Sequence, residues 1–174
     1  MVEIVWLGHG SFELTLESGE VILIDPWVTG NPKYPAGHKI DRVDAILITH
    51  GHFDHTADVV RLAKEFSAPV VAIHEIGEWL ATKGVTTARG KNKGGTQQVG
   101  SVAVTMTHAI HSSSVTENGQ IVYLDEAAGF VLTFADGRSA YFAGDTTGFG
   151  DMALIEELYK PELAFLPIWR PLHD

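Results

Sequence analysis

The chain has 174 residues, 45% of them hydrophobic, and this composition is sufficient for one domain with a substantial core. Its 12 basic and 22 acidic residues give a formal net charge of -10, which repels nucleic acid backbones and anionic membrane surfaces and disfavours both as partners. It contains no cysteine, so disulfides and thiolate metal sites are excluded, and any metal must be bound through nitrogen and oxygen.

The beginning of the chain predicts an antiparallel meander. The opening MVEIVWLGHGSF has neither a basic segment nor a long apolar run, so we expect no signal peptide, no membrane span and a cytoplasmic location. Short apolar or alternating runs, separated by HG and ESG turns, indicate three strands at residues 3–8, 11–16 and 20–25.

Two strand–helix units follow the meander. Residues 44–49 (DAILIT) form a continuous apolar run, which is typical of a strand buried on both faces, and residues 55–66 then show helical periodicity. Residues 68–73 and 74–84 repeat this unit, with Gly84 as the predicted stop of the second helix.

The second half of the chain is richer in strands. Apolar runs predict strands near residues 101–109, 119–124, 129–134 and 139–144. A helix is expected near residues 151–160, where Pro161 terminates it, and a final apolar run covers residues 163–168. Strand-rich segments with interspersed helices suggest stacked sheets covered by helices.

The most informative stretch is ITHGHFDH at residues 48–55, which places three histidines and one aspartate in its last six positions. His50 and His52, in a loop leaving a buried strand, can direct both imidazoles at one point. Asp54 and His55 begin the next helix and can face a second point nearby. Asp54 alone could be a helix cap, and a single loop histidine is usually solvated. The four together instead favour a two-metal ligand pattern.

Other predicted strands end in residues of the same kind. His111 follows one strand, and Asp145 follows another, where its carboxylate could bridge two ions. Asp25 ends a third strand and could orient a ligand histidine. Each has a simpler alternative, because Asp25 precedes Pro26 in a possible turn and Asp145 could form an Asx-turn. Together they predict candidate ligands along one edge: His50, His52, Asp54, His55, His111 and Asp145.

Further polar residues have less specific interpretations. His9, between the first two strands, could line the pocket or be an ordinary turn histidine, and Ser112 could bind substrate or satisfy its loop. A basic stretch could attract an anionic substrate, although we favour a solvated mobile loop. Its cations are Lys83, Arg89, Lys91 and Lys93.

The motifs THGHFDH, ILIDP, AIHSSS and AGDT, in this chain's arrangement, resemble the metallo-β-lactamase superfamily. The segments LGHGSF, ILIDPWVTGNP, AGFVLTF and GDMALIEELYKPELAFLPI are similar to its small bacterial and archaeal metal-dependent hydrolases, relatives of the ascorbate-6-phosphate lactonase branch. The resemblance implies an α/β fold, a four-layer αββα sandwich with a dinuclear site. It implies His50, His52 and His111 on the first metal, Asp54 and His55 on the second, and Asp145 bridging both.

The chain departs from the family pattern after LPI. Family members continue through a Gly-rich turn, a helix and a last strand that delivers another histidine, whereas this chain reads WRPLHD. We therefore expect one domain over residues 1–174, truncated at the C-terminal strand and helix, and a second metal lacking one ligand unless His173 replaces it. We also expect a homo-oligomer that covers the apolar surface this would expose.

The resemblance points to a metal-dependent hydrolase of a small-molecule ester, lactone or phosphoester. One or two divalent ions, zinc above all but also manganese or iron, would lower the pKa of a water to about 7, and the resulting hydroxide would attack the substrate. Asp54 would orient that hydroxide or accept its proton. The alternative is a catalytically impaired metal-binding or interaction remnant. A diiron redox protein is disfavoured because His52 stands where those proteins usually carry a carboxylate.

Overall fold

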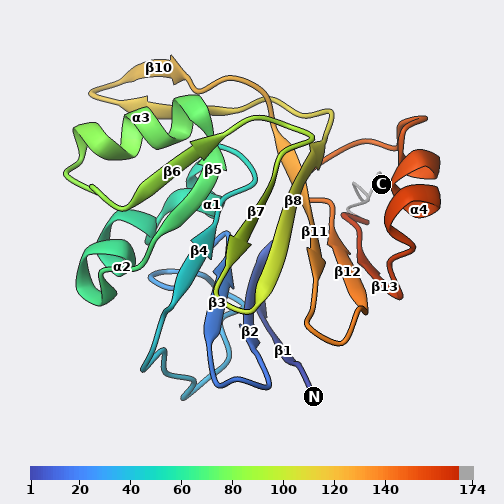
Figure 1. Ribbon diagram of the computed structural model, residues 1–174. Coiled ribbons are helices and arrows are strands. Elements are labelled where there is room, and N and C mark those ends of the chain that lie inside the picture. The colour runs from blue at the N-terminus through green and yellow to red at the C-terminus, as the bar shows by residue number, and fades with distance from the viewer. Residues whose placement is uncertain (169–174) are drawn as a thin grey trace, which may run out of the picture.

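Two β-sheets pack face to face in the computed structural model, which describes residues 1–168 (Figure 1). The first sheet has the strand order β1-β2-β3-β4-β5-β6, antiparallel from β1 to β3 and parallel from β3 to β6. Helices α2 (Val59–Phe66) and α3 (His74–Thr82) cover its outer face. Its strands are β1 (Glu3–Gly8), β2 (Ser11–Thr15), β3 (Val21–Ile24), β4 (Ala45–Leu47), β5 (Val70–Ile73) and β6 (Ala88–Lys91).

The second sheet has the order β13-β12-β11-β8-β7 and is antiparallel except for the pair β12–β13. Helix α4 (Met152–Tyr159) covers its outer face, where Ile155 packs against Val131 and Tyr141. The predicted αββα sandwich of the α/β class is thereby confirmed. The strands are β7 (Thr96–Val99), β8 (Val102–His108), β11 (Ala128–Thr133), β12 (Ser139–Phe142) and β13 (Leu163–Phe165).

The core lies between the sheets and is joined by aromatic contacts. Phe12 of β2 meets Phe142 of β12 with ring centroids 5.4 Å apart, and it meets Phe165 of β13 at 4.8 Å. Phe142 and Phe165 stack at 4.4 Å. Burying each aromatic side chain contributes about 1.5–3 kcal/mol. These rings therefore fix the two sheets against each other beneath the edge where the predicted ligands lie.

The helix predicted over residues 55–66 is instead two helices, α1 (Phe53–Thr56) and α2. The break falls at Asp58, whose carboxylate accepts hydrogen bonds from the backbone N–H groups of Val28 and Thr29, at 2.7 Å each. Asp58 thus binds a distant loop rather than capping its own helix. Because those partners lie about thirty residues away in sequence, helical periodicity does not reveal the break.

The expectation of a mobile basic loop is wrong. Ala88–Lys91 form β6 and Thr96–Val99 form β7, while Lys83 and Lys93 make ion pairs with Glu117 and Glu126. Short polar strands at sheet edges lack the apolar alternation that identifies a strand. They were missed for that reason.

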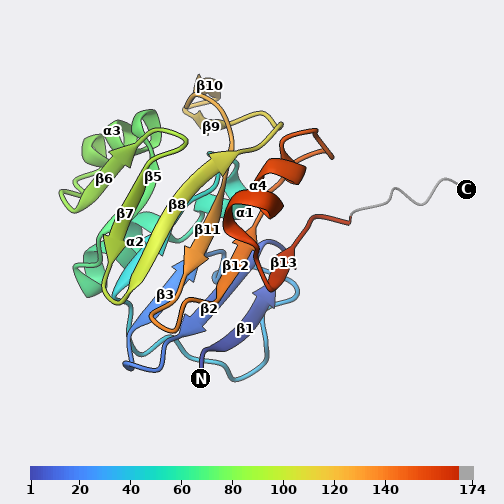
Figure 2. The same ribbon diagram turned by 45° about the vertical axis from the view of Figure 1, so that its right-hand side comes forward.

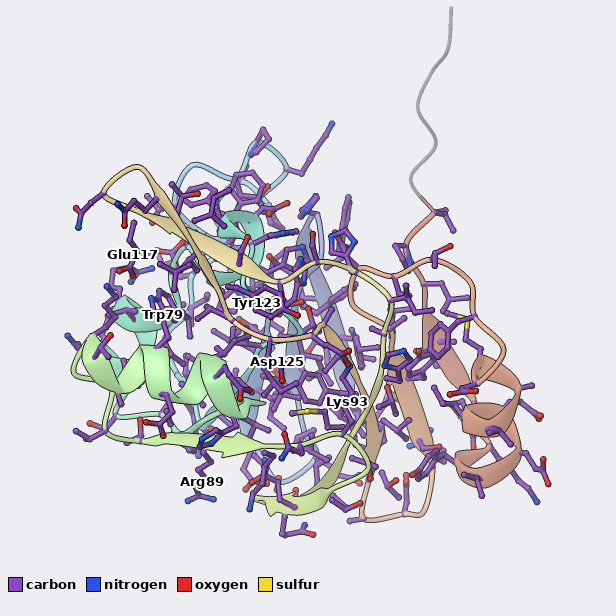
Figure 3. All side chains as sticks on the ribbon, turned by 90° about the horizontal axis from the view of Figure 1, so that it is seen from above. Trp79, Arg89, Lys93, Glu117, Tyr123 and Asp125 are labelled. Atoms are coloured by element: carbon purple, nitrogen blue, oxygen red, sulfur yellow. The ribbon has the colours of Figure 1, made fainter. Side chains whose placement is uncertain are left out.

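A hairpin of β9 (Ser114–Glu117) and β10 (Gln120–Tyr123) stands apart from both sheets. It is held against α3, because Trp79 Nε1 donates a hydrogen bond of 2.6 Å to Glu117 (Figure 3). The hairpin begins three residues after His111, so its attachment to α3 also fixes the end of the loop that carries this histidine.

The terminal strands β1 and β13 lie on the same side of the sandwich (Figure 2). Trp6, Leu163 and Leu166 are each about half exposed there. The homo-oligomer and the cytoplasmic location stay predictions. Among residues 1–168, no helix has the length and apolar character needed to cross a bilayer.

Candidate metal centre

Four chain segments deliver the predicted ligands to one edge of the sandwich. His50 and His52 follow β4, Asp54 and His55 lie on α1, and His111 and Asp145 follow β8 and β12 of the other sheet. Strand ends of both sheets meet here, which is why residues up to 95 positions apart become neighbours. The structure brings all six predicted ligands together, whereas His173 lies outside the described residues.

His50, His52 and His111 form the first group. One ring nitrogen from each lies within 4.8 Å of the others. His50 Nε2 and His52 Nδ1 are 3.1 Å apart. Burial lowers the pKa of His50 well below its usual range and also lowers that of His52, with the neighbouring imidazoles adding to both effects. Both side chains are therefore held as neutral imidazoles, the form that binds a metal.

Asp54, His55 and Asp145 form the second group. His55 Nε2 lies 3.6 Å from an Asp145 oxygen and 4.0 Å from an Asp54 oxygen. The same Asp145 oxygen is 3.8 Å from His111 Nε2 of the first group. Asp145 thus lies between the groups, where one carboxylate can contact two ions. His55 Nε2 is buried and has no hydrogen-bond partner among the described residues.

Asp25 orients ligands of both groups. Its Oδ2 accepts hydrogen bonds from Thr49 Oγ1 at 2.6 Å and from His55 Nδ1 at 2.8 Å. Thr49 Oγ1 gives its only proton to Asp25, so at 3.0 Å it must accept a hydrogen bond from His50 Nδ1. Both histidines thereby carry a proton on Nδ1 and direct Nε2 toward the site, which is the arrangement of carboxylate-oriented histidines in metal sites.

Charge in the centre also depends on Asp25. Although burial opposes the charged form of His55, Asp25 and Asp145 outweigh it and raise the pKa of His55 to about 10. The adjacent His55 imidazole in turn lowers the pKa of Asp145 below its usual range. The buried His55 therefore accommodates positive charge, either as a proton or as a cation.

The residues fit a divalent metal. A buried ring nitrogen without a partner, aimed between two carboxylates, is costly unless it is ligated or protonated. Imidazole nitrogen and carboxylate oxygen suit zinc, manganese or iron. The first group would hold one ion through His50, His52 and His111, and the second group would hold another through Asp54, His55 and Asp145.

The two predicted pocket residues both contact the centre. His9 Nε2 is 2.6 Å from Asp54, and Ser112 Oγ is 3.2 Å from His52 Nε2. Sequence reasoning missed Thr49, which relays the orientation of His50. For Ser113, as for Ser112, it left substrate binding and a loop contact open, and Ser113 Oγ accepts a hydrogen bond of 3.1 Å from the Gly51 N–H. No sequence signal separates these hydroxyls from other loop residues.

A cleft of about 950 Å³ opens beside the centre. Its wall includes His111 and Asp145 of the centre together with the aromatic residues Trp6, Phe12 and Phe165. Within the described part of the chain, no lysine or arginine lines it. A small organic molecule would fit this volume, and its apolar part would contact aromatic rings.

Comparison with known proteins agrees with this geometry. Residues 20–173 match the Beta-lactamase superfamily domain. The chain is 60% identical over 167 residues to a UPF0173 metal-dependent hydrolase of Solibacter usitatus (strain Ellin6076), covering 96% of this chain and 73% of that protein. Identity to a UPF0173 metal-dependent hydrolase of Koribacter versatilis (strain Ellin345) is 52% over 168 residues, covering 96% and 72%.

Among solved structures, the fold matches Igni18, a novel metallo hydrolase from the hyperthermophilic archaeon Ignicoccus hospitalis KIN4/I. The TM-score is 0.77 at 31% identity, covering 94% of this chain and 69% of that one. The sandwich and its histidine- and aspartate-rich edge thus define a domain of the metallo-β-lactamase type. The chain belongs to the β-lactamase superfamily and, within it, to the UPF0173 metal-dependent hydrolases. The resemblance read from the sequence is confirmed.

Proposed function

We propose that this chain uses one or two divalent ions, zinc above all, to hydrolyse a small, uncharged ester or lactone. The observation that carries the proposal is the convergence of six candidate nitrogen and oxygen ligands, two of which, His111 and Asp145, also line a largely apolar cleft. A phosphoester is less well supported, because no cationic side chain from the described residues lines the cleft to bind its charge.

When bound, a divalent ion acts as a Lewis acid and lowers the pKa of a water molecule toward neutrality. The side chains would supply the remaining functions. Asp54 is about one-third exposed at the site and would accept the proton of the attacking water. Asp25 and Thr49 would hold His55 and His50 in the correct tautomers. The aromatic wall of the cleft would bind the apolar part of the substrate and exclude bulk water from it.

The test is a hydrolysis screen of zinc-loaded protein with 4-nitrophenyl esters, simple lactones and 4-nitrophenyl phosphate. We expect turnover of an ester or lactone that a chelator abolishes and added zinc restores. His111→Ala should lose both an ion and the activity. His74→Ala, at the exposed start of α3 and outside the centre, is the matched control and should retain both.

Other outcomes would redirect the assignment. Turnover of the phosphate ester alone would contradict the substrate class. A zinc-loaded protein that hydrolyses none of these compounds would favour the impaired metal-binding remnant.

A further inference from the structure

We propose that His9 is a direct protein ligand of the second metal, together with Asp54 and His55. This rests on the proposed function only in assuming an ion at that position. The ITHGHFDH motif does not predict such a ligand. His9 lies far from the motif in sequence, in the turn between β1 and β2.

The distances suit a shared ion. One ligand atom from each of His9, Asp54 and His55 lies within 4.8 Å of the others. His9 Nε2 is 2.6 Å from Asp54 Oδ2, and that oxygen is 4.0 Å from His55 Nε2. Two ligands at about 2.1 Å from a tetrahedral ion lie roughly 3.4 Å apart, which is between these two values. Small side-chain rotations would therefore make all three atoms ligands.

The β1–β2 turn is shaped to bring His9 to this position. His9 has a left-handed φ of 56°, which is uncommon for a residue with a side chain. The turn is fixed by Trp6, whose Nε1 donates a hydrogen bond of 2.8 Å to the His9 carbonyl oxygen. At Gly10, a Cβ atom would lie 2.7 Å from His55 Cε1, so a glycine is required for this approach. A strained backbone beside a reactive group is a feature of functional sites.

The surroundings of His9 hold its ring in place. It contacts Trp27 and His55 edge-on, with ring centroids 5.7 and 5.3 Å apart. The His9 side chain is 41% exposed, so an ion can reach it from solvent. His55 Nε2 still lacks a hydrogen-bond partner among the described residues, although His9 is close to it. An ion between these two rings would satisfy that nitrogen and replace the contact between His9 and Asp54.

The competing explanation is that His9 only donates a hydrogen bond that positions Asp54. His9→Gln separates the two, because its amide NH2 can still donate to Asp54 but cannot serve as an imidazole ligand. His9→Ala removes both functions. His111→Ala, in the first group, should lose the first ion and keep the second. His74→Ala is the control outside the centre.

The experiment is titration of metal-free protein with zinc and with cobalt, following ions bound per chain, dissociation constants and the cobalt absorption spectrum. We expect two ions in the unsubstituted protein. His9→Gln and His9→Ala should each keep the first ion and bind the second at least tenfold more weakly, with loss of the corresponding cobalt bands. Thermal unfolding of the metal-free variants, compared with metal-free unsubstituted protein, identifies any variant that has not folded.

Two results would overturn the proposal. One is a His9→Gln variant that binds two ions with unchanged affinity and cobalt spectrum. The other is an unsubstituted protein that binds only one ion, at the first group, while retaining ester hydrolysis. If the second ion depends on His9 but no ester or lactone is hydrolysed, the ligand assignment stands and the proposed function fails.

Discussion

Replacing Asp25 by asparagine should disturb both metal groups without changing the size of the side chain. Asp25 is 1% exposed and accepts three hydrogen bonds: from the Thr49 N–H at 2.8 Å, the Thr49 hydroxyl at 2.6 Å and His55 Nδ1 at 2.8 Å. Its φ of 47° is left-handed, which asparagine tolerates at least as well as aspartate. Backbone strain therefore does not account for the expected effect.

The magnitude follows from these contacts. In Asp25→Asn, one oxygen can still accept from the Thr49 N–H, but an NH2 group replaces the oxygen that accepts from Thr49 Oγ1 and His55 Nδ1. Hydrogen bonds to a charged group contribute about 1.5–3 kcal/mol each, and rotation of the Thr49 hydroxyl recovers part of one. We expect the free energy of unfolding of the metal-free protein to fall by about 2–4 kcal/mol.

The same change should weaken metal binding. The new NH2 group favours the His55 tautomer with its proton on Nε2, which is the nitrogen that must face the ion. Loss of such an orienting partner typically lowers metal affinity by about 10–100-fold. Urea unfolding in the presence of a chelator measures the first effect, and zinc titration measures the second.

The reasoning would be refuted by an Asp25→Asn protein with unchanged zinc affinity, even if it were less stable, because orientation of His55 would then not depend on Asp25. Asp25→Ala is a less specific comparison, since it also leaves a cavity. Asp44→Asn serves as the surface control for loss of an aspartate, because Asp44 contacts Arg42 and the Val21 N–H away from the centre.

Two further predictions concern contacts elsewhere in the sandwich, and a third concerns the centre itself. Burial raises the pKa of Asp58, but the hydrogen bonds that it accepts from Thr29, Arg61 and Val28 outweigh burial and lower that pKa. The Asp58 carboxylate therefore stabilises the fold above about pH 4, and this stabilisation is lost as pH falls through the lowered pKa. The difference in unfolding free energy between unsubstituted protein and Asp58→Asn, about 2–3 kcal/mol at pH 7, should therefore shrink toward pH 3; a constant difference would contradict this. Phe142→Ala should cost about 3–5 kcal/mol in urea unfolding, because Phe142 is 2% exposed and joins the sheets, whereas a loss below about 1 kcal/mol would show that the aromatic contacts do not hold the sheets together. Chelation of the unsubstituted protein should lower its melting temperature but leave that of a His50→Ala, His55→Ala double variant unchanged, and an equal decrease in both would mean that the stabilising ion binds elsewhere.

The sequence predicted most of what positions the centre. Candidate ligands such as His111 and Asp145 could be placed at this edge because each follows an apolar run, and the ends of neighbouring strands meet at an edge of a sheet. The role of Asp25 could be anticipated for the same reason. The role of Thr49 could not be anticipated, because it depends on one hydroxyl that donates a hydrogen bond to Asp25 and accepts one from His50.

Other features depend on contacts between distant residues. The break before α2 is set by the contact of Asp58 with the loop at Val28, which local periodicity does not contain. The strands β6 and β9 lack an apolar run, and they form because neighbouring strands offer backbone hydrogen-bond partners. His9 had two equally good interpretations from sequence, and only the fold brings its ring to Asp54.

The candidate ligands come from both halves of the sandwich, with His50, His52, Asp54 and His55 on the side of the first sheet and His111 and Asp145 on the side of the second. An ion bound in either group would thus crosslink two layers that are otherwise joined at that edge by side-chain packing and a few hydrogen bonds, such as that from the Ala128 N–H to the Thr49 carbonyl oxygen at 2.9 Å. The bound ion would join segments that are distant in sequence and so shorten the loop between them. If ligands from both segments stayed attached in the unfolded chain, the ion would also reduce the entropy of that chain. Amide hydrogen exchange at the open ends of β4 and β12 should then slow in parallel as metal is added, although the two strands belong to different sheets.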